Sequence, residues 1–398
     1  MARPALTRQG AVVVGAGVVA IVIGRVFAII ELYVIGAGFL ATTAVAVAYV
    51  AARRPRIEAS RWIHPAVLVA GETGHVDIRL HHTGALASAP FVLEEPVMRT
   101  MTEDHVARLP VPSLPAGSVS TSGYRVPTTT RGVVGLGPLR LIVSDVLGVA
   151  RSTSVIDGAD EIVVAPRTLA VDMPELGRGR LGRALLESSR RLGPGDFHGL
   201  REYASGDEPR SIHWKASARS DDLVVKEFTV EGLHRCTVVF DPAPSAHGSS
   251  AGFEHGVTAA ASLVSSAMRA GLNTRFVTAG GIDLRGPEVV HTTQRVLARI
   301  EPSDRPLAAL DNDMTDGLVL LVVVTGSHHA ASWRTSGAIA DPTITRVLVA
   351  TSGDASGAAL GVSARSEGEF VSAWQAMVGH PVATRVEVDA PMPHPERA

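Results

Sequence analysis

Two long apolar runs near the N-terminus constrain this chain more than any other feature. No charge interrupts residues 11–24, and 21 uncharged residues run from Leu32 to Ala52, with only Arg25 and Glu31 between the two runs. About 20 apolar residues cross the hydrocarbon core of a bilayer, and an arginine near the end of a run can reach the interface. The sequence therefore predicts two transmembrane helices, Gly10 to Ile30 and Leu32 to Ala52, joined by a tight turn.

Basic residues flank this predicted hairpin on its outer sides. The positive-inside rule places loops rich in arginine in the cytoplasm, so both termini and the bulk of the chain are expected there, behind two spans of the plasma membrane. A cleaved signal peptide would explain the first run, but the second would still hold the product in the membrane. The flanking residues are Arg3, Arg8, Arg53, Arg54, Arg56 and Arg61.

Part of the first run also matches a nucleotide-binding pattern. Residues 12–20 read as a short strand followed by G-x-G-x-x-A, at Gly15, Gly17 and Ala20. The helix after such a turn needs a polar face, and the residues that follow offer only Arg25. Small residues suit helix packing in lipid equally well, so we interpret the run as a membrane helix.

Composition narrows the function classes. The 398 residues are long enough for two or three domains, and the formal net charge of -2 argues against a general nucleic-acid binder, which needs a basic surplus to neutralise phosphates. The only cysteine, Cys236, allows no intramolecular disulfide and no thiolate zinc cluster. It opens an apolar run and is expected to be a small buried core residue.

After the hairpin the sequence changes to a period of two. Residues 76–80 alternate apolar and polar, and glycine, proline and serine turns recur until about residue 167. This pattern predicts an all-β, immunoglobulin-like sandwich. His81 and His82 are adjacent, so they should point to opposite faces of a strand and cannot share a metal.

A glycine-punctuated basic segment follows at residues 171–194. It contains five arginines against two glutamates, and we interpret it as a mobile basic linker. Attraction to anionic lipid headgroups is the functional alternative.

Charge is densest between Asp196 and Glu227, where twelve of 32 residues are ionised. Only two of the chain's 37 basic residues are lysines, Lys215 and Lys226, and both lie here. Opposite charges interleaved with aromatic residues predict a partly buried ion-pair network, which can equally be a binding site. The candidate residues are Asp196, Phe197, Arg201, Glu202, Tyr203, Gly206, Asp207, Arg210, Ile212, His213, Trp214, Lys215, Ala218, Arg219, Lys226 and Glu227.

This block also carries a recognisable pattern. It resembles the signature of the domain of unknown function 58 family of bacterial membrane-associated proteins, in which no catalytic activity is established. The resemblance implies two N-terminal transmembrane helices, a β-sandwich, the signature block and a von Willebrand factor A-like domain. It also implies MoxR-type AAA+ ATPases and other membrane proteins as partners. The residues that carry it are DFHGLREY at 196–203, GD at 206–207, IHWK at 212–215 and KEF at 226–228, with LGP at 136–138 and SDVLG at 144–148 upstream.

The remainder of the chain alternates predicted strands and helices, as a doubly wound α/β sheet does. We expect strands at residues 236–240, 274–278, 318–325 and 344–350, and helices at 253–270, 292–300 and 366–378. Ligands of such folds bind at the carboxyl ends of strands, where Asp241 lies.

A metal site at this edge is possible but expected to be degenerate. The resemblance implies a D-x-S-x-S loop that holds Mg²⁺, and Asp241 and Ser245 match its first and last positions, whereas Ala243 replaces the middle serine. A second aspartate expected after residue 324 is replaced by Thr325-Gly326-Ser327. We therefore expect no cofactor, with Asp241 capping the turn that follows it.

Two functions remain from different classes. The first is a membrane-anchored, non-enzymatic interaction or scaffold protein that acts with a MoxR-type AAA+ ATPase. The second is a hydrolase or transferase, with Asp207 or His213 as general base and Lys215 or Arg210 holding an anion, although no nucleophile elbow, P-loop or H-E-x-x-H accompanies them. The expected segments are a membrane hairpin at 1–56, a β-sandwich at 57–168, a linker and signature block at 169–235 and a von Willebrand A-like domain at 236–398.

Overall fold

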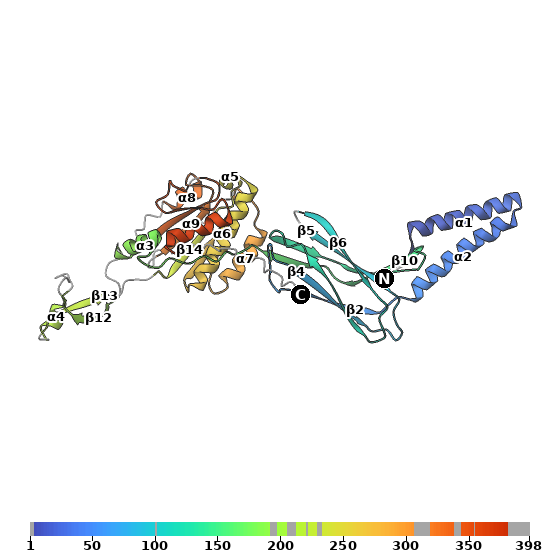
Figure 1. Cartoon of the computed structure of the whole chain (residues 1–398), viewed down its shortest axis with the longest axis horizontal. Helices are drawn as coiled ribbons and strands as arrows, with labels where there is room; N and C mark the ends of the chain where they lie inside the picture. Colours follow the sequence, from blue (N-terminus) through green and yellow to red (C-terminus); the bar gives the residue numbers. More distant parts are fainter. Residues whose placement is uncertain are drawn as a thin grey trace, which may run out of the picture. The chain divides into compact units, whose positions relative to one another are not determined.

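The structure is a computed structural model, and its chain divides into two compact units (Figure 1). Unit 1 comprises residues 1–166 and unit 2 residues 167–398. The residues that the structure describes are 4–99, 102–191, 197–204, 212–219, 222–228, 233–305, 319–337, 344–353 and 355–380.

Unit 1 begins with two long apolar helices, α1 (Arg8–Phe27) and α2 (Ile30–Ala52), which pack side by side (Figure 1). The Thr7 side chain caps α1 by accepting a hydrogen bond from the backbone N–H of Gly10, and Ala28 ends it with a left-handed φ of 55°. Both helices are long and apolar enough to cross a membrane, as predicted.

Small residues let the two helices approach closely. A Cβ atom on Gly36 would lie 2.6 Å from the carbonyl oxygen of Gly17, so backbone meets backbone at this point. Gly15 and Gly17 lie inside a continuous helix rather than in a turn after a strand. The dinucleotide pattern at residues 12–20 is therefore coincidental.

The rest of unit 1 consists of two sheets that share one core. Ile78 and Leu80 from the smaller sheet pack with Leu93, Leu136 and Leu141 from the larger. The smaller sheet has the order β2 (Ile57–His64), β4 (Gly74–His82), β7 (Val119–Val126). The larger has the order β1 (Pro4–Leu6), β10 (Ala150–Asp157), β9 (Leu139–Ser144), β5 (Phe91–Arg99), β8 (Gly132–Leu136), β11 (Asp160–Ala165), β3 (Leu68–Val69), and β6 (Thr102–Val111) also pairs with β5.

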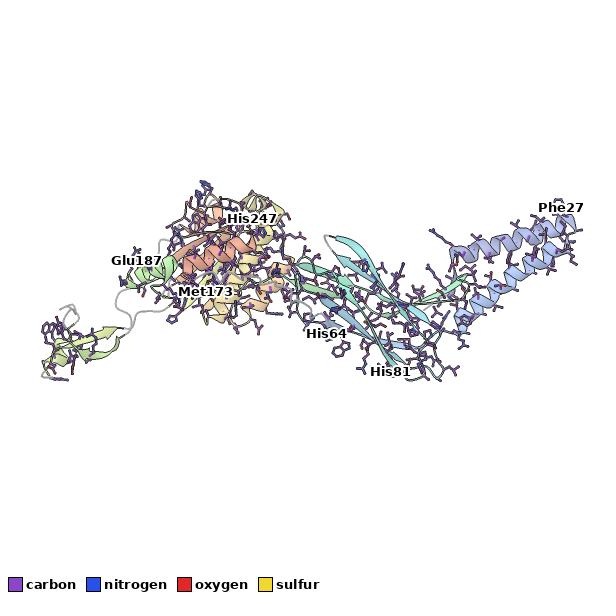
Figure 2. The ribbon with its side chains drawn as sticks, in the orientation of Figure 1. Phe27, His64, His81, Met173, Glu187 and His247 are labelled. Carbon is purple, nitrogen blue, oxygen red and sulfur yellow. The ribbon has the colours of Figure 1, made fainter. Side chains whose placement is uncertain are left out.

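The alternation seen in the sequence is reproduced in β4, where buried and more exposed residues alternate along the strand. His82 is buried and its Nδ1 lies 3.0 Å from the Pro115 carbonyl oxygen, while the neighbouring His81 is exposed (Figure 2). The two rings thus point to opposite faces of the strand, as predicted.

A buried charge network connects the two sheets. The side chain of Arg61 is 7% exposed and its Nη2 lies 2.7 Å from Oε1 of Glu95, whose other oxygen accepts a hydrogen bond from the Tyr124 hydroxyl at 2.8 Å. Burial raises the pKa of Glu95, and burial together with the neighbouring carboxylate raises the pKa of Tyr124. The prediction that Arg61 flanks the membrane is therefore wrong, because its guanidinium group is buried inside unit 1 and pairs with the Glu95 carboxylate.

Unit 2 is built on a largely parallel six-stranded sheet. Its order is β16 (Asp283–Arg285), β15 (Asn273–Val277), β14 (Arg235–Phe240), β17 (Val319–Thr325), β18 (Ile344–Ala350), β19 (Gly361–Ser363), and only β16 pairs antiparallel within this set. The sheet is accompanied by α3 (Gly179–Arg191), α5 (Pro244–His247), α6 (Ser250–Arg269), α7 (Val289–Arg299), α8 (Ala331–Ser336) and α9 (Glu367–Val378). The expected strands and helices of this region are present.

Cys236 lies in the central strand β14 and is fully buried, as predicted. Burial raises the pKa of its thiol to about 12. The residue is therefore an inert part of the core.

The segment before the signature block is part of this unit. Helix α3 buries Leu181 and Leu185 completely in the same core cluster as α6 and α9, and the indole N–H of Trp374 donates to the Asp172 carbonyl at 2.8 Å. The interpretation of a mobile basic linker at 171–194 is thus wrong for residues 171–191. Leucines on one face of α3 pack inward, whereas Arg183, Arg190 and Arg191 lie outside the buried set.

Candidate functional site

The carboxyl ends of the central strands carry a buried polar cluster, which we call the Asp241 cluster. It comprises Asp241 after β14, Thr325 at the end of β17 and Ser332 in α8. Oδ2 of Asp241 accepts hydrogen bonds from the Thr325 hydroxyl at 2.9 Å and the Ser332 hydroxyl at 2.5 Å, and Oδ1 accepts one from the backbone N–H of Ala243 at 3.1 Å. All three cluster residues are buried.

A histidine completes this edge of the sheet. His247 is 1% exposed, stacks on Phe240 and lies within unit 2 (Figure 2). Its Nε2 is 2.5 Å from the Asp241 carbonyl oxygen and its Nδ1 is 2.7 Å from the Thr351 hydroxyl. A carbonyl can only accept, so Nε2 carries the proton and Nδ1 accepts from Thr351 in the neutral ring. Burial lowers the pKa of His247, which favours this neutral form.

Close backbone approach locks the same loops together. A Cβ atom on Gly326 would overlap the carbonyl oxygen of Ala246, so no side chain fits between the loops that follow β14 and β17. Gly326 is therefore required where the sequence resemblance implies an aspartate.

The Asp241 cluster does not have the donor set of a magnesium site. Mg²⁺ binds oxygen ligands in octahedral geometry, usually with carboxylates and several waters. Here one carboxylate already accepts three protein hydrogen bonds, and Ser245 is exposed on α5. Within the described residues, no group of three histidine, cysteine, aspartate or glutamate side chains could hold a metal. The predicted Asx-type cap of Asp241 is present in the bond to Ala243.

Sequence reasoning found Asp241 but missed its partners. Thr325 and Ser332 lie 84 and 91 residues further along the chain, and Thr351 lies 104 residues beyond His247. The available signal was a threonine directly after each of two aliphatic runs, at the ends expected to meet at one edge of the sheet.

The signature block forms a separate element, which we call the signature hairpin. It comprises β12 (Phe197–Glu202), the short helix α4 (Trp214–Ser217) and β13 (Val224–Phe228). The strands pair antiparallel, with Arg201 opposite Val225 and Leu200 opposite Lys226, and Ile212 forms a bridge to Val225. Among the hairpin side chains that the structure describes, Ile212 and Val225 are buried.

His213 has a structural role at the start of α4. Its Nδ1 accepts a hydrogen bond from the backbone N–H of Ala216 at 3.0 Å, which caps the helix. The Ser217 hydroxyl in turn accepts from the backbone N–H of Val224 at 2.9 Å, which ties α4 to β13.

The structure does not bring those candidate residues that it describes into a closed site. Of those described, Ile212 is buried, His213 is partly buried, and the others are exposed, namely Arg201, Glu202, Tyr203, Trp214, Lys215, Ala218 and Arg219. The backbone, but not the side chains, is described for Phe197, Lys226 and Glu227. Asp196, Gly206, Asp207 and Arg210 lie outside the described residues.

The signature hairpin instead exposes large apolar side chains. Trp214 is 67% exposed and Leu200 is 47% exposed, beside Tyr203 and Leu223. Among the described residues of unit 2, these four are the large apolar side chains that are exposed. The candidate residues chosen from the sequence include Tyr203 and Trp214 but not Leu200 and Leu223.

Comparison with solved structures gives partial matches of low similarity. They include the alkylpurine DNA glycosylase AlkC of Pseudomonas fluorescens, with 15% identity over 27% of this chain and 30% of that chain and a TM-score of 0.21. A beta-glucosidase from Listeria innocua matches with 17% identity over 29% of this chain and 17% of that chain, TM-score 0.21. The CARDB domain of the PF1109 protein from Pyrococcus furiosus matches with 9% identity over 29% of this chain and 97% of that chain, TM-score 0.20. With TM-scores this low, these matches carry no argument about fold or function.

No curated protein matches the chain. A family model described as "Protein of unknown function DUF58" matches residues 199–305, which take in most of the signature hairpin, the Asp241 loop and α6. This match supports the resemblance of the signature block to the DUF58 family of proteins of unknown function.

Proposed function

We propose that this protein is a membrane-anchored, non-enzymatic interaction protein whose signature hairpin receives a MoxR-type AAA+ ATPase. In this proposal α1 and α2 span the plasma membrane, the two sheets of unit 1 form an immunoglobulin-like sandwich in the cytoplasm, and unit 2 lies in the cytoplasm as well. Unit 2 is a von Willebrand A-like domain that has no metal. The strand order of its sheet is compatible with that fold, because the strands are added outward on one side of β14 and then on the other side, beginning with the parallel neighbour β17.

The observation that carries the proposal is the exposure of Leu200, Tyr203, Trp214 and Leu223 on a two-stranded hairpin. A hairpin of this size is marginally stable alone, and exposed aromatic and apolar side chains are the residues that dominate protein interfaces. Arg201 and Lys215 follow Leu200 and Trp214 in the sequence, are exposed, and would provide the polar rim. A partner would bury apolar surface that the described part of unit 2 leaves in water.

Two observations favour binding over catalysis. The Nδ1 lone pair of His213 is engaged in the α4 cap, so its neutral ring carries the proton on Nε2 and has no free basic nitrogen. In the Asp241 cluster, both carboxylate oxygens already accept hydrogen bonds inside the protein. The competing hydrolase or transferase, which would use Asp207, His213 and Lys215, would have to rely on Asp207 as its base, because His213 in this arrangement does not supply one.

Exposed arginines support the proposed orientation of the α1–α2 hairpin in the membrane, because they lie at the end where α1 begins and α2 ends. Arg8 lies at the start of α1, and Arg53, Arg54 and Arg56 follow the end of α2. The positive-inside rule favours the cytoplasm for this end, together with the sheets of unit 1 and with unit 2.

The test is quantitative affinity purification of the full chain from native membranes, comparing wild type with Trp214→Ala and with Leu200→Ala. We expect both variants to lose the AAA+ ATPase while they remain folded and membrane-bound. Leu86→Ala removes a side chain that is 79% exposed in unit 1 and serves as the matched control, which should retain the ATPase. Undiminished recovery with both hairpin variants would show that the partner, if captured, binds elsewhere.

A further inference from the structure

The turn between β9 and β10 in unit 1, residues 145–149, exposes apolar side chains to an unusual extent. Val146 is 97% exposed and Leu147 is 61% exposed. Leu6 in the adjacent strand β1 is 44% exposed. Single exposed apolar residues are common on soluble proteins, but neighbouring ones at the tip of a turn indicate a contact surface.

This turn lies beside the helical hairpin, not at a remote end of the sandwich. Leu6 pairs with Ala150, and the next residue, Thr7, donates from its hydroxyl to the Gly148 carbonyl at 2.6 Å and from its backbone N–H to the Val149 carbonyl at 3.0 Å. Thr7 is also the residue that caps α1. The turn and the first turn of α1 are therefore fixed to one another.

The turn also reaches alongside the apolar part of the helices. Val149 and Ala150 form a buried cluster with Ala46 and Val50 of α2, and Val13 of α1 packs against it. Ala46 lies six residues before the end of α2, which corresponds to roughly 9 Å along the helix axis. If α2 spans a bilayer up to its end, then the turn lies at the depth of the lipid interface.

Hydrogen bonds within the protein pair backbone polar groups of the turn, as a position at the lipid interface requires. The buried carboxylate of Asp145 accepts hydrogen bonds from the N–H groups of Leu147 at 2.9 Å and Ala150 at 2.6 Å. The N–H of Gly148 donates to the Asp145 carbonyl, and Thr7 satisfies the carbonyls of Gly148 and Val149. Irregular backbone at membrane depth is tolerated where its polar groups are paired within the protein, and these bonds provide that pairing.

Charge at the same end fits a bilayer surface. Five exposed arginines surround the base of the hairpin, and arginines at this level pair with anionic headgroups while apolar tips enter the interface. These residues are Arg8, Arg53, Arg54, Arg56 and Arg151.

We infer that the turn at residues 145–149 is a third membrane contact, in which Val146 and Leu147 insert into the lipid interface beside the transmembrane hairpin. This contact would fix the tilt of the two sheets of unit 1 relative to the bilayer. Without it, that angle would depend on the short segments that join α1 and α2 to the sheets. The inference rests on the proposed membrane anchoring by α1 and α2.

The experiment uses the full chain reconstituted into vesicles of phosphatidylcholine and phosphatidylglycerol. Single-cysteine variants Val146→Cys, Val34→Cys and Val67→Cys carry an environment-sensitive fluorophore, and lipids with a nitroxide on the acyl chain quench labels that contact lipid. Val34 is a 63% exposed position in α2 and reports on the span itself. Val67 is 48% exposed and follows β2. It lies beyond the end of β2 that is away from α2, and the length of this strand separates the two by roughly 25 Å. Cys236 is fully buried, so unsubstituted protein provides the labelling blank.

We expect quenching at position 146 to approach that at position 34, with position 67 unaffected. Quenching at 34 without quenching at 146 overturns the inference and leaves the membrane anchoring intact. No quenching at 34 overturns the anchoring and the inference with it. Equal quenching at 67 also overturns the inference, because contact with lipid would then not be particular to the turn. Because the quencher is part of the lipid, cover by a second copy of the chain would leave position 146 unquenched.

Discussion

Substitution of Asp241 distinguishes a structural cluster from a metal site by the sign of its effect on stability. In the structure, the Asp241 carboxylate accepts two hydroxyl hydrogen bonds and one from the Ala243 N–H, and it is buried. Hydrogen bonds to a charged group contribute about 1.5–3 kcal/mol each, against about 0.5–1.5 kcal/mol for neutral ones. Asp241→Asn keeps one acceptor oxygen but loses the charge and places an N–H₂ group against one donor. We therefore expect the free energy of unfolding of unit 2 to fall by about 2–4 kcal/mol.

A metal site predicts the opposite result. Without its ion, a buried carboxylate ligand is an uncompensated charge, so Asp241→Asn would stabilise the metal-free protein. Added Mg²⁺ would stabilise the wild type by mass action and leave the variant unchanged.

The assay is hydrogen exchange of the full chain in detergent micelles, read by mass spectrometry on peptides that cover β14 and β17. Measurements in EDTA and in excess Mg²⁺ separate the two cases. Ser245→Ala, at an exposed position, is the matched control and should change stability by less than about 0.5 kcal/mol. An Asp241→Asn variant as stable as wild type in EDTA, combined with stabilisation of wild type by Mg²⁺, would refute the structural role.

Three further predictions concern stability. Leu185→Ala in α3 should cost about 2–5 kcal/mol because the side chain is fully buried, whereas Arg183→Ala on the same helix should be nearly neutral in urea denaturation. Arg61→Leu should cost about 3–5 kcal/mol at neutral pH by leaving Glu95 buried without its partner. Since burial already raises the pKa of Glu95, that deficit should shrink as pH falls toward 4.5 and the carboxyl takes up a proton; an unchanged deficit in acid would contradict it. His247 has a lowered pKa, so its contribution is complete above pH 6.5 and is lost as pH falls, and His247→Gln should flatten the stability profile of unit 2 between pH 7 and 5, measured by thermal unfolding.

The features that the sequence predicted are those with a strong local signal. The hairpin follows from uninterrupted apolar length, and the strands of unit 2 follow from aliphatic runs such as residues 319–325, all of which are buried. Cys236 was expected in the core because of the run it opens. Each of these features can be predicted from a sequence window of fewer than 25 residues.

Features that depend on distant partners could not be predicted. The five arginines and the glycines of residues 171–191 resemble a linker, and only packing of Leu181 and Leu185 against elements far along the chain makes α3 part of the core. The partners of Asp241 are likewise more than 80 residues away. Arg61 was assigned to the membrane flank because its buried partner, Glu95, belongs to another strand.

The clasp between α3 and α9 has a consequence for biosynthesis. Trp374 bonds to Asp172 across 202 residues, and Gly179, at a φ of 63°, lies against the backbone of Val378, where a side chain would not fit. At elongation rates of about 5–20 residues per second, α3 leaves the ribosome roughly 10–40 s before its partner helix exists. During that interval the leucines of α3 lack their contacts with α9, so this part of the core of unit 2 closes only when α9 arrives.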